Sequence, residues 1–291
     1  MGSQSSTTES ANGAQPYQPG ATPQVRTRGL QGLKARPINL QPHPQSTDPG
    51  AVAAVIPCFN EDRTIGQLVS QLRQHIELVV VVDDGSTDET AVTAERAGAM
   101  VLRHDRNRGK GASLRTGLSY IHSLGCEWAV TMDGDGQHDP ADLPTLFRCA
   151  EQTGASLVIG NRMGNAETMP WLRRQVNRWM SKKLSHFASR RLPDTQSGFR
   201  LIHLQTWTDL PLTAQRFEVE SEMLMAFLAA NHPVEFVPIR AIPAARKSRI
   251  RPMADTLRWL KWWRETRKPS DRIPINQPGQ GENSPNENFA H

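Results

Sequence analysis

The sequence has few cysteines and no long apolar run. Its three cysteines, Cys58, Cys126 and Cys149, are scattered and lack the close spacing of a metal-binding set. This pattern argues against a disulfide-rich framework and predicts reduced thiols in a cytosolic protein. No stretch approaches the ~20 apolar residues needed to cross a bilayer, and no apolar segment follows the first residues. We therefore expect neither a membrane-spanning helix nor a secretory signal.

Apolar residues are also scarce at both ends of the chain. Only 37% of the 291 residues are apolar, which is below the usual share for a globular protein. Residues 1–48 and 269–291 are rich in Gln, Ser, Gly, Asn and Pro and show no apolar periodicity. Segments this polar bury too little apolar surface to offset the entropy lost on ordering. We expect two disordered tails around one folded domain of residues 49–268.

Runs rich in Val and Ile alternate with helical patterns through most of this domain. Runs that are apolar on both faces are typical of strands in a mostly parallel sheet with helices on both sides. The alternation predicts an α/β fold, in which ligands bind beyond the carboxyl ends of the strands. The expected strands are 51–56, 78–82, 100–102, 128–132 and 156–159, and the expected helices are 62–75, 88–97, 111–123 and 142–152.

The most informative strand end is the acidic turn, residues 131–140, with the sequence TMDGDGQHDP. Asp133, Asp135 and Gln137 alternate with glycines, so one side of this turn presents only oxygen ligands. Oxygen ligands suit Mg²⁺ or Mn²⁺, which often bind together with a substrate diphosphate. A surface turn is also rich in Asp and Gly, and taken alone the segment fits either interpretation.

Residues 57–61, PCFNE, follow the first expected strand. A turn in which Asn60 or Asp62 caps the next helix explains part of this motif. That interpretation does not explain Phe59 and Glu61, which can pack on a base and hydrogen-bond to a ribose.

Residues 83–88, DDGSTD, follow the second expected strand. One of the last three residues is expected to cap the following helix. The adjacent carboxylates of Asp83 and Asp84 can accept a hydrogen bond from a base and face a ribose. A phosphoacceptor receiver domain also has paired acids at a strand end, but it would leave the acidic turn unexplained.

Residues 107–112, NRGKGA, begin a predicted helix. Glycines, a helix N-terminus and Lys110 together favour binding of an anion. The spacing excludes a phosphate-binding P-loop, because the four-residue spacer and the Lys-Ser/Thr ending are missing.

The second half of the domain contains two basic segments that are expected to form amphipathic helices, 169–192 and 250–268. Such helices can lie in a membrane interface, where tryptophan is favoured, or they can pack on the domain with a solvated charged face. No nucleic-acid motif is present, so we expect no nucleic-acid partner. In the first segment the apolar stripe comprises Leu172, Val176, Trp179, Met180, Leu184 and Phe187, and the bases are Arg173, Arg174, Arg178, Lys182 and Lys183.

Taken in order, these motifs resemble glycosyltransferase family 2. The similar branch is the one that contains dolichyl-phosphate mannose synthase and dolichyl-phosphate glucosyltransferase. Residues 194–200, DTQSGFR, and 217–220, FEVE, add to the likeness, which covers about residues 51–265.

The resemblance implies a GT-A fold, a UDP- or GDP-sugar donor, a divalent metal (Mg²⁺ or Mn²⁺) and transfer with inversion. It assigns Asp133, Asp135 and Gln137 to the metal, and Asp133, Asp135, Arg162 and Asp194 to the catalytic centre. The residues it assigns to nucleotide binding are Pro57, Phe59, Glu61, Asp83, Asp84, Lys110 and Asp133.

The resemblance also implies an acceptor side. Arg162, at the end of a Gly-x-Arg element, would contact a phosphate, and Arg173 and Arg174 would position it. A basic loop with Lys247 and Arg249 would close over the phosphates, although the glycine common in this loop is replaced here.

We therefore expect transfer of a sugar onto a polyprenyl phosphate, by a peripheral protein at the cytosolic face of a membrane. The same fold also serves saccharide hydroxyl acceptors, soluble or in the cell envelope, with Asp194 or Glu218 as the base. A nucleotide-binding module without catalysis is a third possibility, but the complete set of metal ligands in the acidic turn argues against it.

Overall fold

The computed structural model describes residues 51–164, 169–243 and 252–266. The expected tails, 1–48 and 269–291, lie outside these residues, and so do Lys247 and Arg249.

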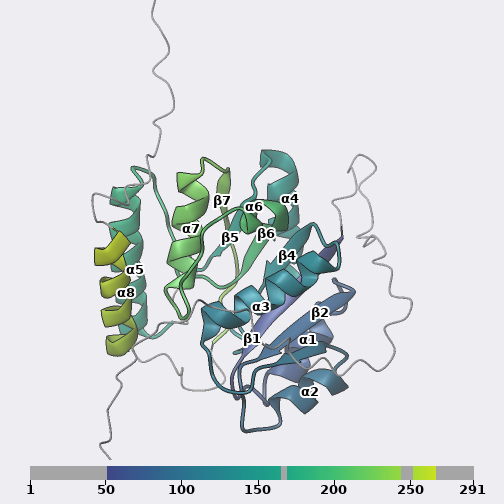
Figure 1. Ribbon diagram of the computed structural model, residues 1–291. Helices are drawn as coiled ribbons and strands as arrows, with labels where there is room; N and C mark the ends of the chain where they lie inside the picture. Colours follow the sequence, from purple (N-terminus) through teal and green to yellow (C-terminus); the bar gives the residue numbers. More distant parts are fainter. Residues whose placement is uncertain (1–50, 165–168, 244–251, 267–291) are drawn as a thin grey trace, which may run out of the picture.

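One sheet runs through the described part of the chain, with the strand order β3-β2-β1-β4-β6-β5-β7 (Figure 1). Strand β6 is antiparallel to both of its neighbours, and every other pairing is parallel. This architecture confirms the predicted α/β fold. The strands are β1 (Val52–Cys58), β2 (Leu78–Asp83), β3 (Met100–Arg103), β4 (Trp128–Thr131), β5 (Leu157–Asn161), β6 (Arg200–His203) and β7 (Val234–Pro238).

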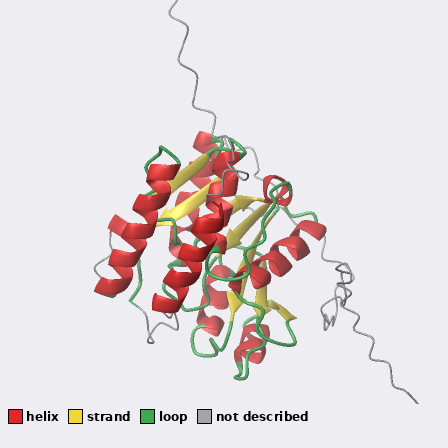
Figure 2. Cartoon of the chain, turned by 60° about the vertical axis from the view of Figure 1, so that its left-hand side comes forward, coloured by secondary structure: helices red, strands yellow, loops and turns green. Residues whose placement is uncertain are grey.

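Helices cover both faces of the sheet (Figure 2). Helices α1, α2 and α4 pack on one face, whereas α3, α5, α6, α7 and α8 pack on the other. The helices are α1 (Ile65–Leu72), α2 (Thr90–Arg96), α3 (Lys110–Ser123), α4 (Leu143–Thr153), α5 (Trp171–Phe187), α6 (Leu204–Thr208), α7 (Val219–Ala229) and α8 (Pro252–Thr266), and a short 3₁₀ turn, η1 (Pro140–Asp142), precedes α4.

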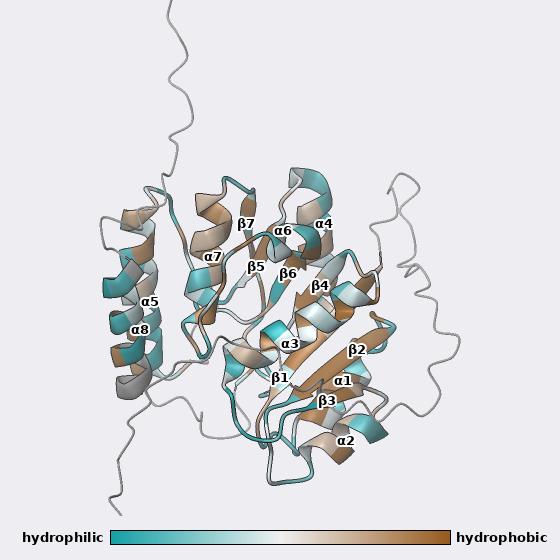
Figure 3. Ribbon diagram, viewed as in Figure 1, coloured by the Kyte–Doolittle hydropathy of each residue, from teal (hydrophilic) through white to brown (hydrophobic). Residues whose placement is uncertain are grey.

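The two-sided cover explains why consecutive positions of the central strands are apolar (Figure 3). In β1, Ala53 and Val55 join the core under α3, while Ala54 and Ile56 join the core under α1. Successive side chains of a strand point to opposite faces, so a strand with a core on each side needs apolar residues throughout. The nine elements expected between residues 51 and 159 are all present, with ends shifted by a few residues.

The two basic segments form α5 and α8, which pack together through aromatic rings. The ring centroids of Trp179 and Trp259 lie 5.5 Å apart, and those of Phe187 and Trp263 lie 5.2 Å apart. Trp259 and Trp263 are therefore buried, as expected for a helix that packs on the domain, and contact of these segments with a membrane stays a prediction. No helix among the described residues is long and apolar enough to cross a bilayer.

Candidate active site

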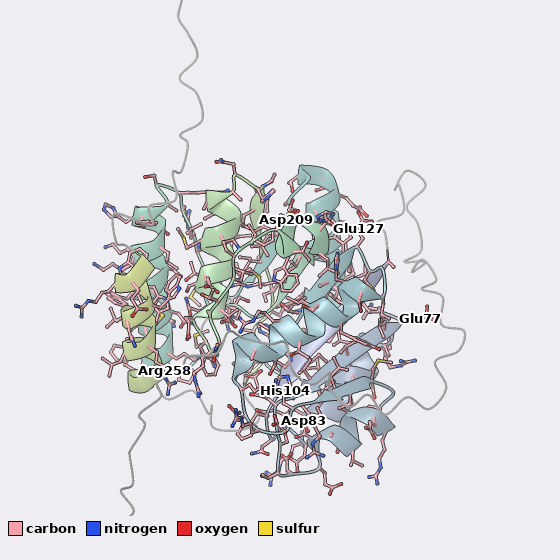
Figure 4. All side chains as sticks on the ribbon, in the orientation of Figure 1. Glu77, Asp83, His104, Glu127, Asp209 and Arg258 are labelled. Atoms are coloured by element: carbon pink, nitrogen blue, oxygen red, sulfur yellow. The ribbon has the colours of Figure 1, made fainter. Side chains whose placement is uncertain are left out.

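The predicted motifs meet at the carboxyl-terminal edge of the parallel strands. In Figure 4, Asp83 at the end of β2 lies near His104, which follows β3. Glu77 and Glu127, which precede β2 and β4, lie well away from this pair. The polar side chains of the predicted motifs thus lie at the carboxyl ends of the strands, where the sequence predicts ligand binding.

Hydrogen bonds between neighbouring loops organise the segment after β1. The Oδ1 atom of Asn60 accepts from the Thr87 N–H at 2.7 Å, and Ser86 Oγ accepts from the Asn60 N–H at 2.8 Å. Asn60 has a φ of 55°, a left-handed conformation that asparagine tolerates better than most residues. Helix α1 has Thr64 at its N-cap, so the expectation that Asn60 or Asp62 caps it is wrong, and the Asn60 side chain instead joins the β1 and β2 loops.

Pro57, Phe59 and Glu61 take different positions in this segment. Pro57 is half-buried in β1, whereas the Phe59 ring is 38% exposed at the sheet edge, where a base can stack on it. Glu61 adjoins the acidic turn: a Cβ at Gly134 would lie 3.6 Å from Glu61 Cγ. Thr64 Oγ1 also donates to the Gly134 carbonyl at 2.6 Å, so the two loops share one wall.

Asp83 and Asp84 are buried and bonded within the protein. Asp83 Oδ1 accepts from the Ser86 N–H at 2.9 Å, and its Oδ2 lies 3.2 Å from Arg103 Nε. Asp84 accepts from the Arg108 and Gly109 N–H groups, each at 2.8 Å, while its Oδ1 lies 2.7 Å from His104 Nδ1. Asp84 thereby fixes the loop that leads into α3.

These contacts set the charge of Asp84. Burial alone raises the pKa of its carboxyl group, but the hydrogen bonds from His104, Arg108 and Gly109 outweigh burial and lower the pKa below 3.8. Asp84 is therefore an ionised anchor, and contact of Asp83 or Asp84 with a nucleoside stays a prediction.

Two amides at the N-terminus of α3 are bonded within the protein. The Gly111 and Ala112 N–H groups donate to the Gln215 carbonyl at 2.8 and 3.3 Å. Binding of an anion at this end of α3 stays a prediction. The Lys110 side chain contacts two carboxylates, with Nζ 2.5 Å from Asp133 Oδ1 and also paired with Glu220 Oε1.

The acidic turn follows β4, and hydrogen bonds fix two of its side chains. Asp135 Oδ1 accepts from the Gln137 N–H at 3.1 Å, and Gln137 Oε1 accepts from Arg173 Nη1 at 2.9 Å. Burial raises the pKa of Asp133, but Lys110 and His138 outweigh this effect and hold the pKa well below its ordinary value. Asp133 is thus ionised at neutral pH.

The turn fits a divalent cation that shares its coordination with a substrate. Asp133, Asp135 and Gln137 supply oxygen atoms only, as Mg²⁺ and Mn²⁺ prefer. No group of three His, Cys, Asp or Glu side chains among the described residues is arranged to hold a metal alone. A cation here would complete its coordination with diphosphate oxygens and water, as Mg²⁺ commonly does.

Gly198, between α5 and β6, allows Asp133 to occupy its position. A Cβ at Gly198 would lie 2.5 Å from Asp133 Oδ1, far closer than two such atoms approach. The loop before β6 therefore packs against the Asp133 carboxylate of the acidic turn.

Arg162 and Asp194 form a closed ion pair beneath the site. Arg162 Nε and Nη2 lie 2.8 and 2.9 Å from the two Asp194 oxygens, and both residues are buried. Burial raises the Asp194 pKa, but Arg162 outweighs burial and lowers it. The pairing orients both side chains inward, so direct contact of Arg162 with a phosphate stays a prediction that would require this pair to open.

Two further arginines lie near the turn. Arg173 and Arg174 belong to the first turn of α5 and are half-buried. Arg173 is bonded to Gln137, whereas Arg174 Nε has no hydrogen-bond partner in the described part of the chain. Of the expected acceptor residues, these two are the best placed to meet a phosphate.

Three buried polar residues were not identified from the sequence. Glu220 pairs with Lys110, and His138 Nε2 lies 3.9 Å from Asp133 Oδ2. Arg200 donates to the carbonyl groups of Ser197, Thr195 and Glu220. A signal was present for Glu220 and Arg200, because each ends a motif that adds to the family likeness, residues 217–220 and 194–200.

The fold and the site define a glycosyltransferase of the GT-A type. The chain belongs to glycosyl transferase family 2, whose model matches residues 53–205. An uncharacterized protein of Methanocaldococcus jannaschii is 32% identical over 199 residues, which cover 66% of this chain and 81% of that protein. A UDP-N-acetylglucosamine–dolichyl-phosphate N-acetylglucosaminyltransferase of Methanococcus voltae is 28% identical over 211 residues, which cover 65% of this chain and 84% of that enzyme.

A solved structure shares the fold at low sequence identity. Glucosyl-3-phosphoglycerate synthase from Mycobacterium tuberculosis, in complex with Mn²⁺, UDP and phosphoglyceric acid, is 20% identical and has a TM-score of 0.61. The match covers 79% of this chain and 81% of that one.

Proposed function

We propose that this protein transfers a sugar from a nucleoside-diphosphate donor to a polyprenyl phosphate, with inversion and with the help of Mg²⁺ or Mn²⁺. The observation that carries the proposal is the bond from Arg173 Nη1 to Gln137 Oε1 at 2.9 Å. It anchors the first turn of α5, where basic and exposed apolar residues are combined, directly on the acidic turn. A lipid phosphate presents both an anion and an apolar chain to such a surface.

The donor would bind at the ends of β1, β2 and β4. The Phe59 ring would stack on the base, Glu61 would face the ribose, and Lys110 would reach the diphosphate. Held by Asp133, Asp135 and Gln137, a divalent ion would supply Lewis-acid stabilisation of the charge that develops on the leaving diphosphate.

The acceptor phosphate would approach from the side of α5. A phosphate oxygen forms the new bond to the anomeric carbon as the bond to the donor diphosphate breaks, and the bonding electrons leave with the diphosphate. A phosphate is ionised near neutral pH, so this attack requires no general base. Arg173 and Arg174 would orient the phosphate oxygens, which suit a guanidinium group.

The alternative, transfer to a saccharide hydroxyl, requires a base. Asp194 is unsuited to that role because it is fully buried and both of its oxygens bind Arg162. Glu218 is half-buried at the start of α7 and would be the base in that case. The relative from Methanococcus voltae is named for a dolichyl-phosphate acceptor, which favours the phosphate.

The amino-terminal ends of α5 and α8 would face the lipid. Trp179 of α5 pairs with Trp259 of α8, and Phe187, further along α5, pairs with Trp263, further along α8. The two helices are therefore parallel and begin at the same end. Trp171, Leu172 and Leu257 near that end are 66%, 54% and 65% exposed. With the exposed bases Arg178, Lys182, Lys183, Arg258 and Lys261, this surface suits peripheral contact with an anionic membrane at its cytosolic face.

Lipid transfer tests the proposal directly. Purified protein with Mn²⁺ and a short polyprenyl phosphate would receive labelled GDP-mannose, UDP-glucose or UDP-N-acetylglucosamine separately. We expect label from one donor to enter the organic phase. Asp133→Ala should reduce transfer by about 100-fold or more, while the exposed Asp209→Ala should not. Nucleotide release without lipid labelling, or full activity of Asp133→Ala, would contradict the proposal.

A further inference from the structure

Lys110 is the cation nearest to the proposed metal ligands. Its Nζ atom lies 2.5 Å from Asp133 Oδ1 and also contacts Glu220 Oε1, and its side chain is only 13% exposed. One ammonium group therefore faces two carboxylates. Charges in such a poorly solvated place interact strongly, because little water screens them.

Glu220 depends on Lys110 for its charge balance. The Glu220 side chain is 5% exposed, and its Oε2 atom has no hydrogen-bond partner in the described part of the chain. The neighbouring Arg200 donates to the Glu220 backbone carbonyl and to two other carbonyl groups. Lys110 is thus the cation that contacts the Glu220 carboxylate among the described residues.

The surroundings of Lys110 hold its ammonium group from three sides. Two of them are the Asp133 and Glu220 carboxylates. The ring of Phe217, with its centroid 5.9 Å from Nζ, flanks the ammonium group. Two carboxylates and an aromatic ring therefore surround the Lys110 ammonium group.

We propose that Lys110 is an internal counter-cation that occupies the acidic turn until a divalent ion displaces it, and that Glu220 retains the displaced ammonium group. This inference rests on the metal assignment of the proposed function. A divalent ion on Asp133 and an ammonium group at 2.5 Å from the same carboxylate repel each other. Glu220 is the positioning residue that gives Lys110 a second partner.

The consequence is weak metal binding before the donor arrives. The divalent ion must break the Lys110–Asp133 contact, which reduces its affinity. A donor diphosphate adds negative charge that both cations can share, so donor and metal strengthen each other's binding.

Metal binding without any substrate tests the inference. Mn²⁺ would be titrated into the full chain, and free Mn²⁺ would be measured by electron paramagnetic resonance. Lys110→Met should bind Mn²⁺ about tenfold more tightly than the wild type, because it removes the competing cation. Glu220→Gln should bind it more weakly, because Lys110 then has Asp133 alone as partner. The exposed Lys182→Met removes the same charge elsewhere and should leave the affinity unchanged.

The double variant Lys110→Met/Glu220→Gln guards against misfolding. It removes the ammonium group together with the buried carboxylate that needs it, and it should also bind Mn²⁺ more tightly than the wild type. Equal or weaker binding by both Lys110 variants would overturn the counter-cation role and leave the proposed transfer standing. Absence of Mn²⁺ binding in all the proteins would overturn this inference and the metal assignment together.

Discussion

Two groups of loops are held by different forces: those after β1 and β2, on the proposed donor side, and those that carry Arg162 and Asp194, on the proposed acceptor side. Around Asn60, Ser86 and Thr87, side-chain oxygens accept from backbone N–H groups of the neighbouring loop. Beneath the acceptor side, Arg162 and Asp194 form a fully buried ion pair. Neutral bonds can be lost singly at modest cost, whereas a buried charge that loses its partner is strongly unfavourable. We therefore expect a large loss of stability when one partner of the buried pair is removed from the acceptor side. Removal of one hydrogen bond from the donor side should cost much less.

The largest expected effect comes from opening the buried pair. Asp194→Ala leaves the Arg162 guanidinium buried without its partner and should lower the free energy of unfolding by about 3–5 kcal/mol. Glu235→Ala, in the exposed pair of Arg190 and Glu235 at 3.3 Å, should cost less than ~1 kcal/mol. Urea unfolding measures the free energy of unfolding of both variants. Equal losses in Asp194→Ala and Glu235→Ala would contradict the expected difference between a buried and an exposed ion pair.

A smaller effect is expected where the two sides touch. Gly198→Ala would push the Asp133 carboxylate aside and should reduce sugar transfer by about 100-fold, because small displacements of catalytic groups are costly. Gly164 has open space around its Cα atom, so Gly164→Ala should transfer normally. An active Gly198→Ala enzyme would show that the loop before β6 does not fix the acidic turn.

Acid should weaken the donor side through Asp84. Its folded pKa lies below the value of 3.8 for an unfolded chain, so ionised Asp84 stabilises the fold above that pH. This contribution is lost as the pH falls through the folded pKa. Asp84→Asn should lower the free energy of unfolding by about 1–3 kcal/mol at neutral pH. The gap to the wild type should narrow when urea unfolding is repeated at acid pH, and a constant gap would exclude this role.

The smallest expected effect is the loss of one bond between loops. Asn60→Ala removes the bond to Thr87 and places alanine at a φ of 55°, which should cost about 1 kcal/mol or slightly more. Asn60→Gly removes the same bond without the backbone strain and should cost less. Thermal unfolding measures the stability of both Asn60 variants. If either variant loses as much stability as Asp194→Ala, the two sides do not differ in the way proposed.

The sequence predicted the donor side better than the acceptor side. Strands β1, β2 and β4 are apolar throughout and end in polar motifs, so both their existence and their common edge follow from the pattern. Nothing in the sequence indicated the partner of Arg162, because Asp194 lies 32 positions further along the chain and only the fold brings the two together. Likewise, Glu220 sits on α7, and its pairing with Lys110 depends on how α7 packs beside α3.

The position of β6 has a consequence for synthesis of the chain. β6 lies between β4 and β5, although both precede it in the sequence. Until residues 200–203 leave the ribosome, β4 has an unpaired edge and β5 has no partner on that side. Exposed apolar edges of this kind invite pairing with other chains. A nascent chain that pauses before β6 therefore needs a chaperone more than one that has passed it.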